Sequence, residues 1–225
     1  MRCLIRLATL LCLVSVPAFG QAPKTTSGLV FSPERANYAF GDRLAGTTSE
    51  PMAITFAALA PAAYHLLTYS AITVEPYPGS PDEFTVDRAD CATPQTDTAC
   101  TVQVRFAPTS TGLQTARIVL TWCNGPASCL SSSANVTANG VVSLIPELYQ
   151  TILRRAPDRG GLAFWSAEAN RTLADGLHVS DTWYAMAEQF FTSPEYAAFS
   201  RTDVDYLADL YQAYLGRTAD SAGIA

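Results

Sequence analysis

The amino-acid sequence predicts a multidomain protein in which an all-β antiparallel sandwich is followed by an all-α helical repeat domain. Residues 28–141 contain short runs of Thr, Val, Ile and Phe that are broken by turn-forming residues, which is typical of β-strands. Residues 144–225 are rich in Ala, Leu, Glu and aromatic residues, which favours helices. Hydrophobic residues make up 48% of the chain and charged residues only 15%, so there is enough apolar material for two packed cores.

The first twenty residues have the composition of a signal peptide. Two arginines precede an apolar run from Leu7 to Val16, and small residues at the third and first positions before Gln21 form a cleavage site. The run is shorter than the roughly 20 residues that span a bilayer, which argues against the alternative of an uncleaved anchor. We therefore expect a secreted, periplasmic or cell-surface protein, with residues 1–20 as the signal peptide and residues 21–27 as a linker.

Four cysteines remain after the signal peptide: Cys91, Cys100, Cys123 and Cys129. Exported proteins fold in oxidising compartments, where disulfides form and persist. Four cysteines allow three pairings, and close spacing favours 91 with 100 and 123 with 129. A zinc site is the alternative, but it is typically built from tighter Cys-x-x-Cys pairs, which this chain lacks. We expect two disulfides, no bound metal and no cofactor.

The first domain shows its clearest strand at Thr101–Phe106, where apolar and polar residues alternate. Residues Ala116–Trp122 alternate in the same way and are the expected partner strand, with a turn at 108–112 between them. Trp122 lies on the apolar face and is expected in the core. Further strands are expected at Met52–Ala57, His65–Val74, Phe84–Asp87 and Ala134–Ala138. About seven short strands over about 110 residues are typical of an antiparallel sandwich.

Several short motifs occur in this domain in a recognisable order. Segment 38–42 (Tyr-Ala-Phe-Gly-Asp) is followed by 46–48 (Gly-Thr-Thr), then Cys91, and then 100–108 (Cys-Thr-Val-Gln-Val-Arg-Phe-Ala-Pro). This series resembles the immunoglobulin-like family of abnormal-spindle and hydin proteins, whose secreted bacterial members are often called choice-of-anchor domains. The resemblance implies an immunoglobulin-like sandwich for residues 28–141. The chain departs from the family at Ala57–Tyr64, where an Asn-x-Gly turn is usual.

The second domain contains an internal repeat, in which residues 148–161 recur at 210–223 with every matched pair 62 positions apart, as 210 is from 148. The repeated residues include Leu148, Tyr149, Leu153, Arg155, Asp158 and Gly161, which match Leu210, Tyr211, Leu215, Arg217, Asp220 and Gly223. We expect Leu148, Ile152 and Leu153 to share a helical face and Asp158 to cap the next helix. Gly160 and Gly161 are expected to permit either close approach or an unusual φ. Trp165 follows the first copy, whereas the second copy stops early. We therefore expect a helical repeat domain over 144–225 with a truncated second repeat, in a chain that is a fragment of a longer product.

The pattern Leu-Tyr-x-x-x-Leu-Gly-Arg-x-Pro-Asp-x-x-Gly-Leu-x-x-Trp, followed by Ser-Pro-Glu-Tyr at 193–196, resembles a bacterial family of domains of unknown function related to phycobilisome linker domains. Arg154 stands where this family has Gly in the first copy, while Gly216 keeps the Gly in the second. The resemblance implies a compact helical module, often found in exported or surface proteins of bacteria. It brings no established activity and no catalytic residues.

The sequence offers little support for chemistry or for nucleic-acid binding. The net charge is −6, Lys24 is the single lysine and the arginines are scattered, so no basic patch is expected. Neither His65 nor His178 belongs to a His-Glu-x-x-His motif, and no Gly-x-Ser-x-Gly elbow is present. The acids at 203, 205 and 209 do not have calcium-loop spacing and are interpreted as favourable charges at a helix start. We therefore expect no catalytic residue and no enzyme activity.

These observations favour an exported, non-catalytic interaction or adhesion protein of unknown ligand. The helical domain is expected to bind a protein partner or another copy of itself, with no nucleic acid and no membrane span after signal cleavage. The alternative is a carbohydrate-binding accessory module of a larger secreted enzyme, in which case a glycan is the partner. Exposed coplanar aromatic side chains would be its signature, with Tyr77, Trp183 and Tyr184 as candidates.

Overall fold

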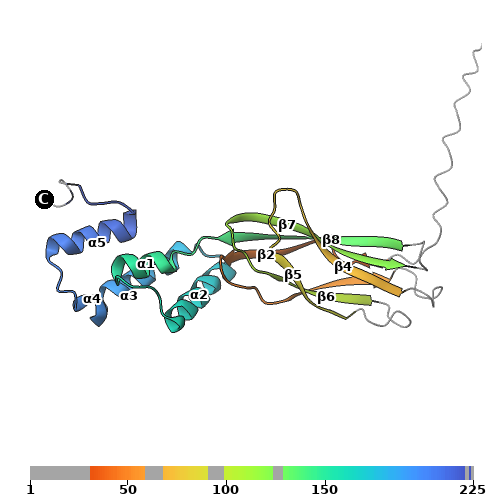
Figure 1. The fold of residues 1–225 in the computed structure, drawn as a ribbon, viewed down its shortest axis with the longest axis horizontal. Helices are drawn as coiled ribbons and strands as arrows, with labels where there is room; N and C mark the ends of the chain where they lie inside the picture. Colours follow the sequence, from red (N-terminus) through yellow and green to blue (C-terminus); the bar gives the residue numbers. More distant parts are fainter. Residues whose placement is uncertain (1–30, 59–67, 91–98, 124–128, 221–222, 224–225) are drawn as a thin grey trace, which may run out of the picture.

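In a computed structural model of the protein, residues 31–58, 68–90, 99–123, 129–220 and 223 are described. Within these residues, two four-stranded β-sheets precede a region of five helices (Figure 1). The first sheet has the order β1 (Phe31–Pro33), β3 (Met52–Ala58), β6 (Ala99–Phe106) and β5 (Phe84–Asp90). The second has the order β2 (Asn37–Leu44), β8 (Cys129–Val141), β7 (Gly112–Cys123) and β4 (Thr68–Pro76). The two-sheet sandwich expected of an immunoglobulin-like domain is therefore present at the level of architecture.

One strand pair departs from the expected antiparallel arrangement. Strand β2 pairs with β8 in parallel, while every other pairing among the described strands is antiparallel. A parallel pair needs a long crossover rather than a hairpin. The chain supplies one because β3 to β7 all lie between these two strands in sequence. The prediction of a purely antiparallel sandwich is wrong at this one edge.

The core lies between the two sheets and follows the alternation of β6 and β7. Val102, Val104 and Phe106 of β6 are completely buried, and Ile118 and Trp122 of β7 are at most 3% exposed. The expected core role of Trp122 is thus confirmed. The expected pairing is wrong, because β6 hydrogen-bonds to β3 and β5, whereas β7 belongs to the opposite sheet. The two strands show the same alternation because they contribute to the same core from opposite sides.

The connection between β6 and β7 crosses from one sheet to the other and is held by a buried carboxylate. Oε1 of Glu83, a residue only 4% exposed, accepts hydrogen bonds of 2.7–3.0 Å from the backbone N–H and hydroxyl groups of Thr109 and Ser110. Although burial by itself would raise the pKa of Glu83, these hydrogen bonds lower it. Gly140 permits close passage, since a Cβ there would lie 2.0 Å from the Ser110 carbonyl oxygen. A segment held in this way is a crossover and not the hairpin turn expected from sequence.

The two expected disulfides have different outcomes. Cys123 and Cys129 face each other in the β7–β8 pair and form a disulfide with an S–S distance of 2.02 Å, which confirms this pairing. Cys100 is also disulfide-bonded, but its expected partner Cys91 lies outside the described residues. His65 lies outside them as well.

Most strand predictions agree with the structure within a few residues. Strand β3 follows its predicted range closely, and β5 extends to Asp90. Strand β4 covers Thr68–Pro76, and the start predicted at His65 lies outside the described residues. Strand β8 is longer than predicted and begins at Cys129. Strands β1 and β2 were not among the strands expected from sequence. In β2 the apolar residues are separated by Gly41, Asp42 and Arg43, and the pairing register shifts between Ala39 and Asp42, so the alternation is hidden.

The helical region comprises α1 (Ile145–Ile152), α2 (Arg159–Ala174), α3 (Ser180–Phe191), α4 (Pro194–Ala197) and α5 (Asp203–Leu215). Helix boundaries agree well with the capping signals. Asp158 caps α2 by accepting a 2.8 Å hydrogen bond from the Gly161 N–H, and Ser193 caps α4 by accepting from the Tyr196 N–H. None of the described helices has the length and apolar character needed to cross a membrane.

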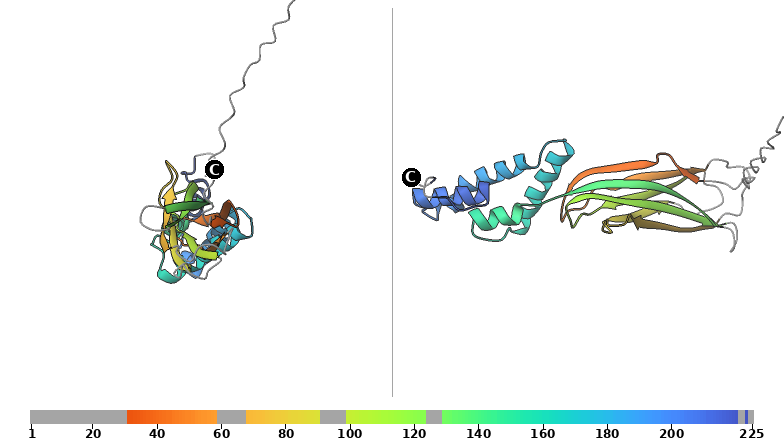
Figure 2. Two further views of the ribbon diagram at one scale, coloured as in Figure 1. Left: turned by 90° about the vertical axis from the view of Figure 1, so that its right-hand side faces the viewer. Right: turned by 90° about the horizontal axis from the view of Figure 1, so that it is seen from above.

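The sandwich and the helices are joined by direct packing, not only by the chain. Residues 142–144 connect β8 to α1, and the helices extend beyond one end of the sandwich along its long axis (Figure 2). Leu44, at the end of β2, is completely buried among the hydrophobic residues of the helical region. Asn170 of α2 accepts from the Leu44 N–H at 3.0 Å and donates to the Thr47 hydroxyl at 3.1 Å. The helices therefore have a defined orientation on the sandwich.

Replacing Asn170 with alanine is expected to loosen this junction. The Leu44 N–H loses its side-chain acceptor, which we expect to cost about 1–2 kcal/mol. Small-angle scattering should show a broader distribution of end-to-end distances, because contact between β2 and α2 is weakened. Asn139→Ala is the control, since Asn139 donates to Asp42 at an exposed site within the sandwich. An unchanged scattering profile for Asn170→Ala would contradict a hydrogen-bonded junction.

Candidate functional site

The first copy of the repeat builds a compact cluster around Tyr149, which we call the first clasp: Tyr149, Arg155, Asp158 and Gly161. The Arg155 guanidinium lies over the Tyr149 ring, 4.9 Å from its centroid. Arg155 Nη1 also pairs with Asp158 Oδ2 at 3.3 Å and donates to the Ala156 carbonyl at 3.2 Å. Asp158 Oδ1 accepts from the Gly161 N–H at 2.8 Å. A cation–π contact, an ion pair and a helix cap therefore support one another.

The second copy builds the same cluster, the second clasp: Tyr211, Arg217, Asp220 and Gly223. The Arg217 guanidinium is again 4.9 Å from the centroid of the Tyr211 ring. Arg217 pairs with Asp220 at 3.5 Å and donates to the Thr218 carbonyl at 3.3 Å, while Asp220 accepts from the Gly223 N–H at 2.8 Å. The matching residues of the two copies thus make matching contacts.

The glycines of both clasps are required by close approach to the tyrosines. A Cβ at Gly161 would lie 1.9 Å from the Tyr149 hydroxyl oxygen, and one at Gly223 would lie 2.3 Å from that of Tyr211. Real Cβ atoms do not approach other atoms so closely, so any larger residue would displace the tyrosine. Neither glycine has a positive φ, so the constraint is space and not backbone conformation.

The two clasps differ in what covers them. Tyr149 is only 4% exposed and packs edge-on against Phe190 of α3, with ring centroids 4.7 Å apart. Arg155 also forms a two-point ion pair with Glu195 of α4, with Nε–Oε1 at 2.5 Å and Nη2–Oε2 at 3.0 Å. This hydrogen-bonded pair raises the pKa of Arg155 and lowers that of Glu195. The first clasp is therefore closed by side chains from two later helices.

The second clasp is open by comparison. Its leucine, Leu215, is 57% exposed, whereas the matching Leu153 is 4% exposed. The Arg217 side chain is 52% exposed, and Asp220 is its ion-pair partner among the described residues. In the rest of the first copy, Leu148 and Trp165 are buried in the helical core, while Leu210 is only partly buried. The leucines of the motif are thus buried in the helical core in the first copy and partly or largely exposed in the second.

A buried acid connects the two copies. Asp209 of α5 is 4% exposed and accepts a 2.9 Å hydrogen bond from the Tyr196 hydroxyl. Arg201 contributes two contacts to Asp209, of 2.9 Å and 3.1 Å, and Arg154 pairs with it from the end of α1. The interpretation of Asp209 as a favourable charge at a helix start is therefore wrong. That role belongs to Asp203 and Asp205, which lie in the first turn of α5.

The pairing with Asp209 also explains why an arginine replaces glycine in the first copy. Arg154 has a φ of +58°, and the matching Gly216 has a φ of +60°. A left-handed backbone costs a non-glycine residue about 1–2 kcal/mol. The ion pair from Arg154 to Asp209 offsets this cost in the first copy, whereas the second copy keeps the unstrained glycine.

Burial first, and then the hydrogen bond to Asp209, raise the pKa of Tyr196 from 10 to about 12. Because the pKa is higher in the folded protein, the contribution to stability is complete below pH 10 and is lost as the pH rises through about 12. Unfolding of the helices, followed by circular dichroism at 222 nm, should therefore become easier over this window. Tyr196→Phe should flatten the dependence. An equally steep loss of helix stability in Tyr196→Phe would contradict this assignment.

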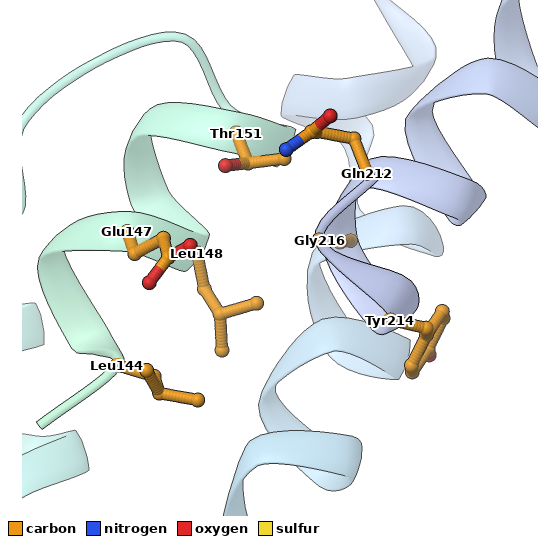
Figure 3. Close-up of a pocket in the computed structure, with 8 residues that line it drawn as sticks. Leu144, Glu147, Leu148, Thr151, Gln212, Tyr214 and Gly216 are labelled. Atoms are coloured by element: carbon orange, nitrogen blue, oxygen red, sulfur yellow. The ribbon is translucent and has the colours of Figure 1, made fainter. Parts of the chain in front are cut away.

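A shallow cavity of about 200 Å³ lies between α1 and α5, where Leu144 and Leu148 point toward α5 (Figure 3). Its lining consists of Leu144, Glu147, Leu148, Thr151, Gln212, Ala213, Tyr214 and Gly216. Its ionisable side chains are the carboxyl group of Glu147 and the phenol of Tyr214. Within the described ranges, no group of three or more His, Cys, Asp or Glu side chains is placed to hold a metal ion. The cavity thus combines the apolar side chains of two leucines with the polar groups of Glu147, Thr151, Gln212 and Tyr214.

No family model matches the chain, and no curated protein matches it. Among solved structures, the chain is similar to the VesB protease of Vibrio cholerae, with 18% identity, coverage of 51% of this chain and 32% of that chain, and a TM-score of 0.37. It is also similar to an ASH / PapD-like domain of human CEP192 (13% identity, 49% and 84% coverage, TM-score 0.32). The secreted serine protease VesC of Vibrio cholerae gives 12% identity, 59% and 27% coverage and a TM-score of 0.35. The chain thus spans about a third or less of the two proteases.

Similarities at these TM-scores assign neither a fold family nor an activity, so both family resemblances stay predictions. The architecture and contacts described above come from the chain itself. They include features that sequence reasoning missed, such as the pairing of Arg155 with Glu195, 40 residues further along the chain. A local signal existed for Asp158, which lies three residues after Arg155, but none for Glu195.

The aromatic side chains expected for glycan binding do not form an open platform. Trp183 is 7% exposed and belongs to the helical core, so its expected exposure is wrong. Tyr184 is 58% exposed but stacks on Tyr214 of α5, with ring centroids 5.8 Å apart and an interplanar angle of 21°. Tyr77 is 41% exposed in the sandwich, where its hydroxyl donates to Asn135 and Arg117 lies over its ring. The contacts with Tyr214 and Arg117 each occupy one face of the tyrosine ring.

Proposed function

We propose that the protein is an exported, non-catalytic interaction protein of the cell surface or periplasm. In this proposal, residues 28–141 form an immunoglobulin-like domain that serves as a spacer or adhesion module, and residues 144–225 form a helical domain that binds a protein partner. The disulfide between Cys123 and Cys129 supports an oxidising location. The signal-peptide composition of residues 1–20 supports export.

The observation that carries the proposal is the uneven distribution of exposed apolar side chains. Nine of the thirteen exposed large hydrophobic residues in the described ranges lie in the helical region. They are Leu162, Phe164, Leu177, Tyr184, Phe199, Val204, Tyr206, Tyr214 and Leu215. A concentration of exposed apolar residues on one part of a protein is typical of interaction surfaces.

Four aromatic side chains in contact with one another form the α3–α5 aromatic group: Tyr184, Phe191, Tyr206 and Tyr214. Phe191 contacts Tyr206 edge-on at 5.6 Å and stacks near Tyr214 at 6.1 Å between centroids. Tyrosines held by neighbouring rings offer contact area at a low entropic cost, and tyrosine is enriched at protein interfaces. The packed junction at Leu44 and Asn170 supports a spacer role, because it fixes the direction in which this surface is presented.

Site-specific photo-crosslinking in the producing cell tests the proposal. A photoreactive residue at Tyr206 or Tyr184 should give a discrete crosslinked protein, whereas one at Leu113, which is 69% exposed in the sandwich, should not. Crosslinks of equal yield at all three positions, or at Leu113 only, would refute binding through the helices. A retained signal peptide and free thiols at Cys123 and Cys129, seen by mass spectrometry, would refute export.

A further inference from the structure

We propose that the second clasp is a docking site for an α-helical segment that presents an aromatic side chain and, at the start of its next helix, a carboxylate. This inference rests on the proposed function and names the chemistry of the partner. The docking surface consists of Tyr211, Leu215 and Arg217. The carboxylate would pair with Arg217, and the aromatic side chain would cover Tyr211 and Leu215.

The chemistry of the partner is given by the first clasp, where the same surface is already occupied. There, Phe190 covers the Tyr149 ring edge-on, and Glu195 forms the two-point pair with Arg155. Glu195 is the second residue of α4, directly after Pro194, so the carboxylate is offered at a helix start. Because the two clasps share residues and internal distances, a segment that fits one has the chemistry to fit the other.

The second clasp keeps the binding groups but lacks these two partners within the described residues. Tyr211 is partly buried, Leu215 is 57% exposed and the Arg217 side chain is 52% exposed. Arg217 Nη1 makes the contacts to Asp220 and to the Thr218 carbonyl. In the first clasp, the corresponding contacts of Arg155 leave Nε and Nη2 to bind Glu195. The equivalent edge of Arg217 is thus oriented for a two-point carboxylate.

Preorganisation favours binding at this site. Arg217 is already held over Tyr211 and by Asp220, so docking would immobilise few additional bonds of the side chain. A second copy of this chain is a poor occupant, since its own Phe190 and Glu195 are engaged with its own first clasp. The chemistry therefore fits a different helical segment that carries the same two groups.

A synthetic peptide with the sequence of residues 159–199, which contains Phe190 and Glu195, is the probe. Fluorescence anisotropy with the full chain should show saturable binding with a Kd on the order of 100 μM, since the peptide must fold on binding. Arg217→Glu in the protein, or Glu195→Gln in the peptide, should weaken binding by about tenfold or more. Combining Arg217→Glu with a Glu195→Arg peptide should restore most of the affinity. Hydrogen exchange should locate the added protection in α5.

Arg117→Glu is the matched control, because Arg117 also lies over a tyrosine ring and pairs with a carboxylate, but in the sandwich. It should leave peptide binding unchanged. No binding up to 1 mM, or equal binding by Arg217→Glu with its fold intact by circular dichroism, would overturn the inference. Self-association of the chain that Arg217→Glu abolishes would also overturn it, by assigning the site to a second copy. If crosslinking from Tyr206 persisted in these cases, the proposed function would stand although the docking site was wrong. The two proposals can therefore be tested separately.

Discussion

Replacing Asp209 with alanine should destabilise the helical region by about 3 kcal/mol, because removal of one member of a buried charge network leaves the others without compensation. Asp209 is 4% exposed and binds Arg154, Arg201 and the Tyr196 hydroxyl. The two arginine side chains are 46% and 29% exposed, so they can regain water. This places the expected loss at the lower end of the range for buried ion pairs. Circular dichroism at 222 nm during denaturation measures it.

Asp203→Ala, on the same helix, is the control for the denaturation of Asp209→Ala. Asp203→Ala removes an acid from the first turn of α5, where an exposed charge contributes only about 0.3–1 kcal/mol. The sandwich should keep its own transition in both variants, because Asp209 lies in α5 and its partners Arg154, Arg201 and Tyr196 all belong to the helical region. If Asp209→Ala and Asp203→Ala lost the same stability, the network around Asp209 would have no special role.

Local features of this fold could be predicted from the sequence because their causes are local. The cap at Asp158 was predicted because its side-chain oxygen reaches an N–H group three residues away. The acids at 203 and 205 were expected at a helix start and lie in the first turn of α5, although its cap, Thr202, was not identified. The disulfide between Cys123 and Cys129 was predicted from its short spacing.

Features that depend on distant pairing were missed. The alternation of β6 and β7 identifies two core strands, but alternation does not say whether they share a sheet. The crossover between them is held by Glu83, which lies 26 and 27 residues before its partners Thr109 and Ser110 in the sequence. The partners of Asp209 lie 8 residues away at Arg201, 13 at Tyr196 and 55 at Arg154, so none belongs to a local helical pattern. An acid near a helix start therefore suggested a surface role that the tertiary contacts overrule.

In the repeat, the local contacts could be predicted from the sequence but the burial of the two copies could not. The recurrence of residues 148–161 at 210–223 predicts matching local contacts, and the two clasps have them. The sequence identity of the copies gave no sign that Leu153 would be 4% exposed and Leu215 57% exposed. That difference arises from α3 and α4, which cover the first clasp. The proposed docking site is thus visible only when the two copies are compared in the structure.

Gly161→Ala should lower the stability of the helical region by about 2 kcal/mol, although alanine is the better helix former by about 1 kcal/mol. The new Cβ would lie 1.9 Å from the Tyr149 hydroxyl oxygen and 3.0 Å from Cζ. Tyr149 cannot move aside freely, because it is 4% exposed between Phe190 and Arg155. Chemical denaturation followed at 222 nm measures the change.

Two glycines of the same chain provide the controls for this prediction. A Cβ at Gly160 would meet only Asp158 Oδ1, at 3.3 Å, so Gly160→Ala should be neutral or stabilising by up to about 1 kcal/mol. Gly223→Ala creates a contact of 2.3 Å with Tyr211, but this tyrosine is only partly buried and can rotate into solvent, so we expect less than about 0.5 kcal/mol. Equal losses for Gly161→Ala and Gly223→Ala would mean that the second clasp is as tightly packed as the first. Docking of the 159–199 peptide should remove this difference, because a covered Tyr211 can no longer rotate away from the added methyl group.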